Sequence, residues 1–141
     1  MQERVENQFL KNIVTPESNT QNPNWVTIED PSYVNLIFEA LGDEDTKSIL
    51  DTVSDTPRII SEILQIAKIP QTSGYRKINS LIDNGLLIVQ GYVDTPDGKK
   101  VKKYKSIFEN VIINIEKDRI VIKIMLSKES LEYGSVKAAQ C

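Results

Sequence analysis

The spacing of apolar residues changes once along this chain, near residue 86, and this change constrains the fold more than any other feature of the sequence. Before that point, apolar residues recur at the spacing that is typical of the buried side of a helix. Beyond it, apolar and polar residues alternate, which is typical of strands with one buried face. The sequence therefore predicts an α+β chain in which helices come first and antiparallel hairpins follow.

Two of the expected helices have clear start signals. Asp30-Pro31 supplies an N-cap followed by proline at the first helical position, and Gly42 ends the helix predicted over 33–41. The next helix lies in the segment 43–55, which opens with acidic residues. The positive end of a helix dipole favours acidic side chains in the first turn, so these residues indicate a helix start.

Two further helices are expected before the spacing changes. One covers 58–68 and is capped by Thr56-Pro57. The other begins at Gln71 or Thr72, and Gly85 fits the left-handed position that follows a helix. Together these signals predict four helices between residues 31 and 85.

Two hairpins follow the helices. The first joins strands on either side of Thr95-Pro96-Asp97-Gly98, a turn with proline and glycine at favoured positions. The second turns at Lys117-Asp118. One face of this second hairpin is apolar and must be covered, either by the domain's own helices or by a second subunit. It consists of Val111, Ile113, Ile115, Ile120, Ile122, Ile124 and Leu126.

These patterns divide the chain into four parts. Residues 1–24 form an N-terminal arm, partly helical and then, over 15–24, a flexible polar linker with no means of burying itself. The main domain covers 25–106, an additional hairpin covers 107–126, and a C-terminal tail covers 127–141. The helical part of the arm is indicated by Val5, Phe9, Leu10, Ile13 and Val14.

The charge is unevenly distributed. The chain of 141 residues carries a net charge of −3, yet the segment 68–105 has eight basic and three acidic residues, a net +5, which leaves −8 for the rest. A basic segment in an acidic protein is a candidate binding surface for phosphate groups. The alternative is a solvated hairpin with a lysine-rich turn.

The composition argues against catalysis. Histidine is absent, and the single cysteine is Cys141. A histidine-based triad, a Cys–His pair and a zinc site of cysteine and histidine are therefore excluded within this chain, although a site made only of carboxylates stays open. Asp43, Glu44 and Asp45 are the nearest candidates, and they are better explained as a helix start. We expect no enzymatic activity, no cofactor, no membrane association and a cytoplasmic location.

The order of the elements is the layout of a winged helix-turn-helix domain, here with an additional C-terminal β-hairpin. Three stretches, ALGDEDTKSILDTVSDTP, IISEILQIAKIPQTSGYRKINSLIDNGLL and VQGYVDTPDGKKVKKYK, occupy 40–105. In their order and spacing they resemble the ArsR-like winged-helix transcriptional regulators, especially the compact archaeal kind. The strings Ile69–Ser73 and Asn84–Leu87 are the most diagnostic. The domain lacks the cysteine and histidine ligands of the metal-sensing members, so a thiolate-bound soft metal is a poor effector and the effector is unknown.

The resemblance and the layout imply a sequence-specific regulator of transcription that binds double-stranded DNA. The fourth helix would enter the major groove, with the basic hairpin over the backbone. Thr72 could instead be a plain helix cap, Tyr75 a core residue, and Arg76 and Lys77 part of a solvated face. The expected DNA-binding residues are Gln71, Thr72, Ser73, Tyr75, Arg76, Lys77, Asn79, Lys99, Lys100, Lys102 and Lys103.

Two further expectations concern partners. A homodimer would suit a palindromic DNA site, because each half-site then takes one helix. The alternative to DNA binding is a winged helix that contacts other proteins in a transcription or other nucleic-acid-associated assembly. Gly74, in the first turn of the fourth helix, either allows a close crossing with the preceding helix or is a tolerated position.

Overall fold

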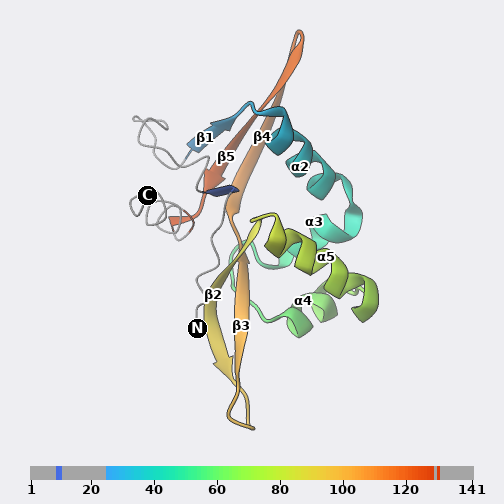
Figure 1. Ribbon diagram of the computed structural model, residues 1–141, viewed down its shortest axis with the longest axis vertical. Coiled ribbons are helices and arrows are strands. Elements are labelled where there is room, and N and C mark those ends of the chain that lie inside the picture. Colours follow the sequence, from blue (N-terminus) through green and yellow to red (C-terminus); the bar gives the residue numbers. More distant parts are fainter. Residues whose placement is uncertain (1–8, 11–24, 129, 131–141) are drawn as a thin grey trace. The chain divides into compact units, whose positions relative to one another are not determined.

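The computed structural model describes residues 9, 10, 25–128 and 130, and in this part of the chain it is an α+β protein (Figure 1). The expected order of helices followed by hairpins is confirmed, and one strand, β1, precedes them. None of the described helices is long and apolar enough to cross a membrane. The elements are β1 (Trp25–Ile28), α2 (Pro31–Gly42), α3 (Glu44–Thr52), α4 (Ile60–Ala67), α5 (Gln71–Asp83), β2 (Leu87–Asp94), β3 (Lys100–Ser106), β4 (Phe108–Glu116) and β5 (Arg119–Leu126).

The chain divides into two compact units. One, which we call the sheet unit, consists of the described residues up to Leu36 and from Phe108 onward. The other, the helix–hairpin unit, is Ile37–Ile107. The single domain that we expected over 25–106 therefore spans both units, because β1 pairs with β5 instead of joining the helices that follow it. Most of the arm, the linker 15–24 and most of the tail lie outside the described residues, so the expectations for them are not tested.

The sheet unit is built on an antiparallel sheet with the strand order β1-β5-β4. Val26 of β1 lies opposite Ile124, and Ile28 lies opposite Ile122. All four side chains are buried, so β1 extends the apolar face of the hairpin onto a third strand. The expected turn between β4 and β5 is confirmed, since Glu116 and Arg119 are the last partners in their register.

Residues before and within α2 complete the sheet unit. The Ser32 amide donates to the Asp30 carboxylate at 2.9 Å, which confirms the expected start of this helix. Phe9 and Leu10 are helical and buried, and the Phe9 ring meets the edge of Tyr33 with a centroid distance of 5.1 Å. The part of the arm that the structure describes therefore contributes to a core.

Local signals set most boundaries of the helix–hairpin unit. Asp43 is the N-cap of α3, where its carboxylate accepts from the Thr46 amide at 3.0 Å. Gly85 follows α5 with φ of 83°, the left-handed conformation expected of it. The Gly98 amide donates to the Thr95 carbonyl at 2.9 Å, which closes the expected turn between β2 and β3.

The expected start of α4 is wrong. Thr56-Pro57 does not cap this helix; the N-cap is Ile59, which makes no capping bond with its side chain. The reason is tertiary: the Arg58 amide donates to the Tyr104 carbonyl at 3.0 Å, and the Tyr104 amide donates back to the Arg58 carbonyl at 2.8 Å. Arg58 is therefore paired in extended conformation with β3 and cannot start a helix.

At Gly74, α5 packs closely against Leu64 of α4. A Cβ atom built at Gly74 would lie 2.4 Å from Leu64 Cδ2 and 3.2 Å from Ile69 Cγ2. No side chain fits at that distance without moving its neighbours. Of the two explanations for this glycine, the close crossing is therefore confirmed.

Candidate nucleic-acid interface

The start of α5 is free of side-chain caps. The helix begins at Gln71 and its N-cap is Pro70, which has no side chain able to accept a hydrogen bond. Thr72 lies inside the first helical turn and is exposed, so its interpretation as a helix cap is wrong. The first amides of the helix are oriented outward along its axis, an arrangement that favours an anionic group.

The burial pattern of α5 separates a core face from an outer face. Gly74, Ile78 and Leu81 are buried against the rest of the unit. Tyr75 is exposed, which argues against its role as a core residue, while Ser73 is only half-buried. The exposed polar side chains among the expected set on this helix, besides Tyr75, are Gln71, Thr72, Arg76 and Asn79.

Lys77 differs from its neighbours because it is held by α3. Its ammonium lies 2.9 Å from the Asp43 carboxylate and 3.3 Å from that of Asp45. The hydrogen bonds that Lys77 and Thr46 donate to Asp43 lower the pKa of its carboxyl from 3.8 to about 2. The same contact with Asp43 raises the pKa of Lys77. Lys77 therefore joins α5 to the start of α3, a position that the sequence pattern alone did not indicate.

The lysine side chains of the β2–β3 hairpin do not all lie on the same face of the hairpin. Lys100 lies opposite Asp94 and Lys102 opposite Tyr92, so these two lysines share a face. Lys100 also forms an exposed ion pair with Asp94, with 2.7 Å between the charged atoms. Lys99, Lys100 and Lys102 are exposed, whereas Lys103 is half-buried on the opposite face.

A bulge shapes this hairpin. The register between β2 and β3 shifts between Val89 and Tyr92, and within the shift Gly91 adopts φ of 100°. Bulges increase the local twist of a hairpin and turn its side chains. Tyr92 beyond the bulge is exposed opposite Lys102, and it is not among the DNA-binding residues expected from the sequence. An aromatic residue next to lysines in a strand was the signal that could have identified it.

Charge is segregated along the helix–hairpin unit. From Ile37 to Ala67 there are two basic and seven acidic residues, and from Lys68 to Ile107 there are eight basic and three acidic residues. The two parts carry −5 and +5, so the unit is neutral as a whole while its second part is basic. Most basic residues of the unit therefore lie on α5 and the β2–β3 hairpin.

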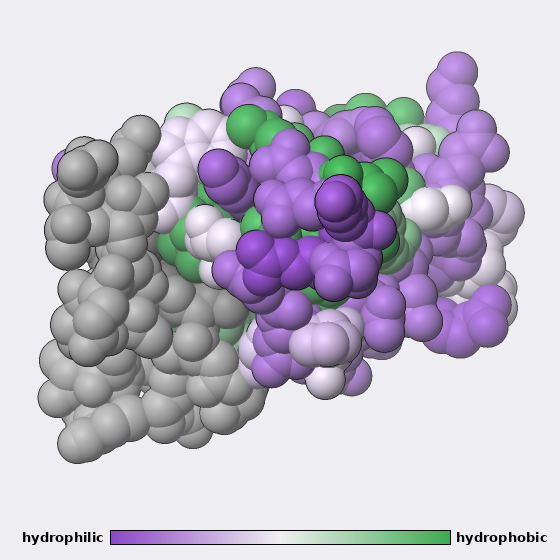
Figure 2. Space-filling view, turned by 90° about the horizontal axis from the view of Figure 1, so that it is seen from above, coloured by the Kyte–Doolittle hydropathy of each residue, from purple (hydrophilic) through white to green (hydrophobic). Residues whose placement is uncertain are grey.

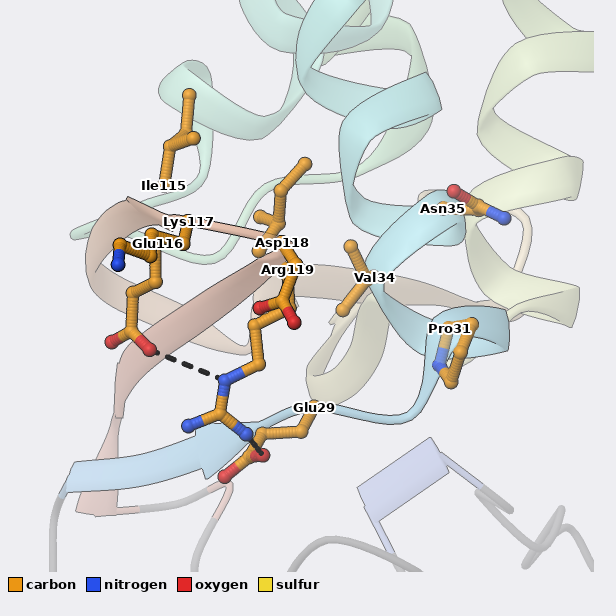
Figure 3. A pocket seen from close by; sticks show the side chains of 10 residues that line it. Glu29, Pro31, Val34, Asn35, Ile115, Glu116, Lys117, Asp118 and Arg119 are labelled. Carbon is orange, nitrogen blue, oxygen red and sulfur yellow. Dashed lines mark hydrogen bonds and ion pairs between the residues drawn. The ribbon is translucent and has the colours of Figure 1, made fainter.

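A hollow lies in the sheet unit (Figure 3). It has a volume of about 560 Å³ and lies between the start of α2 and the turn of the β4–β5 hairpin. Arg119 is one of its lining residues and lies 2.7 Å from the Glu29 carboxylate and 3.2 Å from that of Glu116 (Figure 3). Val34 and Ile115 are among its apolar lining residues. Of the two basic residues in its lining, Lys117 and Arg119, Arg119 is therefore paired with two carboxylates.

Comparison with protein-family models, with curated proteins and with solved structures found no match to this chain.

Proposed function

We propose that Ile37–Ile107 is a winged helix-turn-helix domain that binds double-stranded DNA as a transcriptional regulator, with α5 in the major groove and the β2–β3 hairpin as the wing. The observation that carries the proposal is the outer face of α5. It presents polar side chains suited to base edges at an uncapped helix start, in the basic half of a neutral unit. The resemblance of residues 40–105 to the ArsR-like regulators is part of this proposal.

Arg76 is the side chain best placed for reading sequence. It is exposed on α5 and makes no hydrogen bond or ion pair with any residue that the structure describes. A guanidinium donates two parallel hydrogen bonds to guanine in the major groove, and the amides of Gln71 and Asn79 suit adenine in the same way. Lys77 is already paired with two carboxylates, so its main role in the proposal is to hold α5 against α3.

The hairpin would contribute affinity without sequence preference. Lys99, Lys100 and Lys102 are exposed and flank a tight turn, which is the geometry of a wing over the DNA backbone. Lys100 would exchange its exposed pairing with Asp94 for a phosphate, a small cost because exposed ion pairs contribute little. Contacts of this kind depend on phosphate charge and therefore weaken as salt rises.

A second candidate function is supported by apolar exposure on the same unit. Tyr75, Tyr92, Val93 and Val101 are all exposed, and Val93 and Val101 lie opposite each other in the hairpin. A surface with aromatic and apolar residues is also suited to contact with another protein. The alternative is therefore a winged helix that acts within a protein assembly.

Selection from random duplex DNA, followed by titration at several salt concentrations, distinguishes the two functions. Arg76→Ala should cost about 1–3 kcal/mol on the selected site and relax preference at one base pair. Lys99→Ala should weaken selected and random duplex alike and lower the salt slope by about one unit. Lys47→Ala removes a cation of the same unit that is paired with Asp51 on α3, and it should change neither quantity.

Two results would reject the DNA-binding proposal. One is a selection that enriches no sequence together with binding that does not depend on salt, which would favour the protein-contact function. The other is an unchanged affinity and preference in Arg76→Ala, which would exclude α5 as the reading helix.

A further inference from the structure

Beyond its bulge, the β2–β3 hairpin has two chemically different faces. On one face, two cross-strand pairs bring an aromatic ring and two cations together, and we call it the tyrosine–lysine face. Val93 lies opposite Val101 on the other face, which we call the aliphatic face. All of these side chains are exposed. The tyrosine–lysine face consists of Tyr92, Asp94, Lys100 and Lys102.

The bulge produces this separation. Between the paired residues on either side of it, β2 has two residues, Gln90 and Gly91, where β3 has only Lys103. If the register before the bulge continued unbroken, Tyr92 would lie opposite Val101, on the aliphatic face. Gly91 has φ of 100°, a conformation that glycine adopts readily, and this allows the extra residue to be accommodated. The bulge therefore places the ring of Tyr92 beside lysines.

The exposed lysines of β3 all lie on the tyrosine–lysine face. They are Lys100 and Lys102, and Lys102 makes no hydrogen bond or ion pair with any residue that the structure describes. Lys103, on the aliphatic face, is half-buried, and its Cδ atom lies 3.7 Å from a Cβ built at Gly91. Tyr92 is 51 % exposed. An aromatic ring and two cations are thus accessible from the same side of the hairpin.

The cations distinguish this face from the other exposed apolar surface of the chain. Ile112, Ile113 and Ile115 of β4 are also exposed, and the view onto the end of the molecule that carries the β4–β5 turn shows apolar surface among hydrophilic residues (Figure 2). Within β4, however, there is no lysine or arginine. The combination of exposed cations with an aromatic ring indicates an anionic partner for the tyrosine–lysine face.

The sugar–phosphate backbone of a nucleic acid matches the chemistry of this face. Lysine and tyrosine side chains both donate hydrogen bonds to phosphate oxygens, and the tyrosine ring offers an apolar surface to the sugar. One group on the face acts against such a partner. The Asp94 carboxylate lies 2.7 Å from the Lys100 ammonium, so it would both repel phosphate and compete with it for this lysine.

We propose that the tyrosine–lysine face of the wing lies on the DNA backbone, that Tyr92 is one of its DNA-contacting residues, and that Asp94 weakens this contact. The proposal rests on the DNA-binding function proposed above. It adds to that function the face of the hairpin that meets DNA, a contact residue, and a carboxylate that limits affinity. The aliphatic face is then directed away from the DNA.

Titration of the full chain with random duplex DNA tests the role of Tyr92. Tyr92→Ala should weaken binding by roughly threefold to tenfold, the equivalent of about one net hydrogen bond with the ring contact. Tyr92→Phe keeps the ring and should weaken binding by roughly twofold to fivefold. Val93→Ala is the matched control, because Val93 is the next residue on the opposite face, and it should leave binding within twofold of the unchanged chain. Circular dichroism checks that each variant is folded.

Two pairs of charge variants test which face meets the phosphates. Lys102→Met should lower the salt slope by about one unit, whereas Lys103→Met, the same change on the aliphatic face, should lower it by less than half as much. Asp94→Asn should strengthen binding at low salt by roughly twofold to fivefold, because it removes a like charge and releases Lys100. Asp55→Asn removes an exposed carboxylate outside the hairpin and should change the affinity less than Asp94→Asn does.

The results separate a failure of this proposal from a failure of the proposed function. If the unchanged chain binds no duplex at low salt, both are wrong. If it binds and Arg76→Ala has its expected effect, but Tyr92→Ala binds no worse than Val93→Ala, only the assignment of the face is wrong. A salt slope that falls more in Lys103→Met than in Lys102→Met would place the aliphatic face on the DNA. Equal affinities of Asp94→Asn and Asp55→Asn would overturn the role of Asp94.

Discussion

The close crossing at Gly74 predicts that alanine there destabilises the protein although alanine is the better helix former. A Cβ atom would lie 2.4 Å from Leu64 Cδ2 and 3.1 Å from Leu64 Cδ1. Leu64 and Ile69 are both buried, so neither can swing into solvent to make room. Overpacking of this kind costs about 1–3 kcal/mol, and the gain in helix propensity returns about 0.5–1 kcal/mol.

The net expectation for Gly74→Ala is a loss of about 1–2 kcal/mol in the free energy of unfolding. Denaturant titration measures this loss directly, and for a unit of this size each kcal/mol lowers Tm by about 4–8 °C. Gly42→Ala is the matched control, because Gly42 is also helical and nothing lies within 4 Å of a Cβ built there. That control should be neutral or slightly stabilising.

Repeating Gly74→Ala in a Leu64→Ala variant separates the steric clash from other effects of the substitution on stability. Leu64→Ala removes the atoms that a Cβ at Gly74 would meet, at a cost of its own of about 2–5 kcal/mol. In that background, Gly74→Ala should cost nothing or should stabilise by about 0.5–1 kcal/mol. If Gly74→Ala is as stable as the unchanged chain, or if its cost is the same with and without Leu64, the reasoning from close packing is refuted.

Three other predictions follow from the helix ends. Asp43 has a pKa near 2 in the folded chain instead of 3.8, so the stability that its ionised form provides is present above pH 4 and is lost as the pH falls toward 2. The unfolding free energy of Asp43→Asn should therefore be lower than that of the unchanged chain at pH 6, and the two should converge toward pH 2. A difference that stays constant with pH would contradict this. Gly85→Ala should cost about 1 kcal/mol in denaturant unfolding because φ there is 83°, and a neutral result would mean that the turn relaxes. Thr56→Ala should stay within about 0.5 kcal/mol of the unchanged chain because α4 begins at Ile60, whereas a loss near 1 kcal/mol would restore the capping role.

The features that could be predicted from sequence are those decided within a few residues. Gly85, the Thr95–Gly98 turn and the Asp30 cap each depend on their own backbone and immediate neighbours, and all three are as expected. The alternation of apolar and polar residues through β4 and β5 likewise predicts a hairpin closed by a short turn, as the structure has it. The exposed outer face of α5 was predictable for the same reason, since helical spacing fixes which side chains face away from the core.

The features that were missed depend on residues far along the chain. β1 has only four residues, and its strand character is decided by its pairing with β5. Thr56-Pro57 is a strong local cap signal, yet the backbone pairing of Arg58 with Tyr104 overrides it. The attachment of Lys77 to Asp43 also joins two helices across 34 positions. Local patterns contain no information about such partners.

The pairing of β1 with β5 has a consequence for how the chain is synthesised. Val26 lies opposite Ile124, 98 positions later. At about 5–20 residues per second, β1 leaves the ribosome roughly 5–20 s before its partner strand exists. The contiguous segment Ile37–Ile107 is complete earlier, and its folding shortens the free loop that the β1–β5 pairing must close. We therefore expect β1, although it is synthesised before its partner, to be among the last of the described strands to pair.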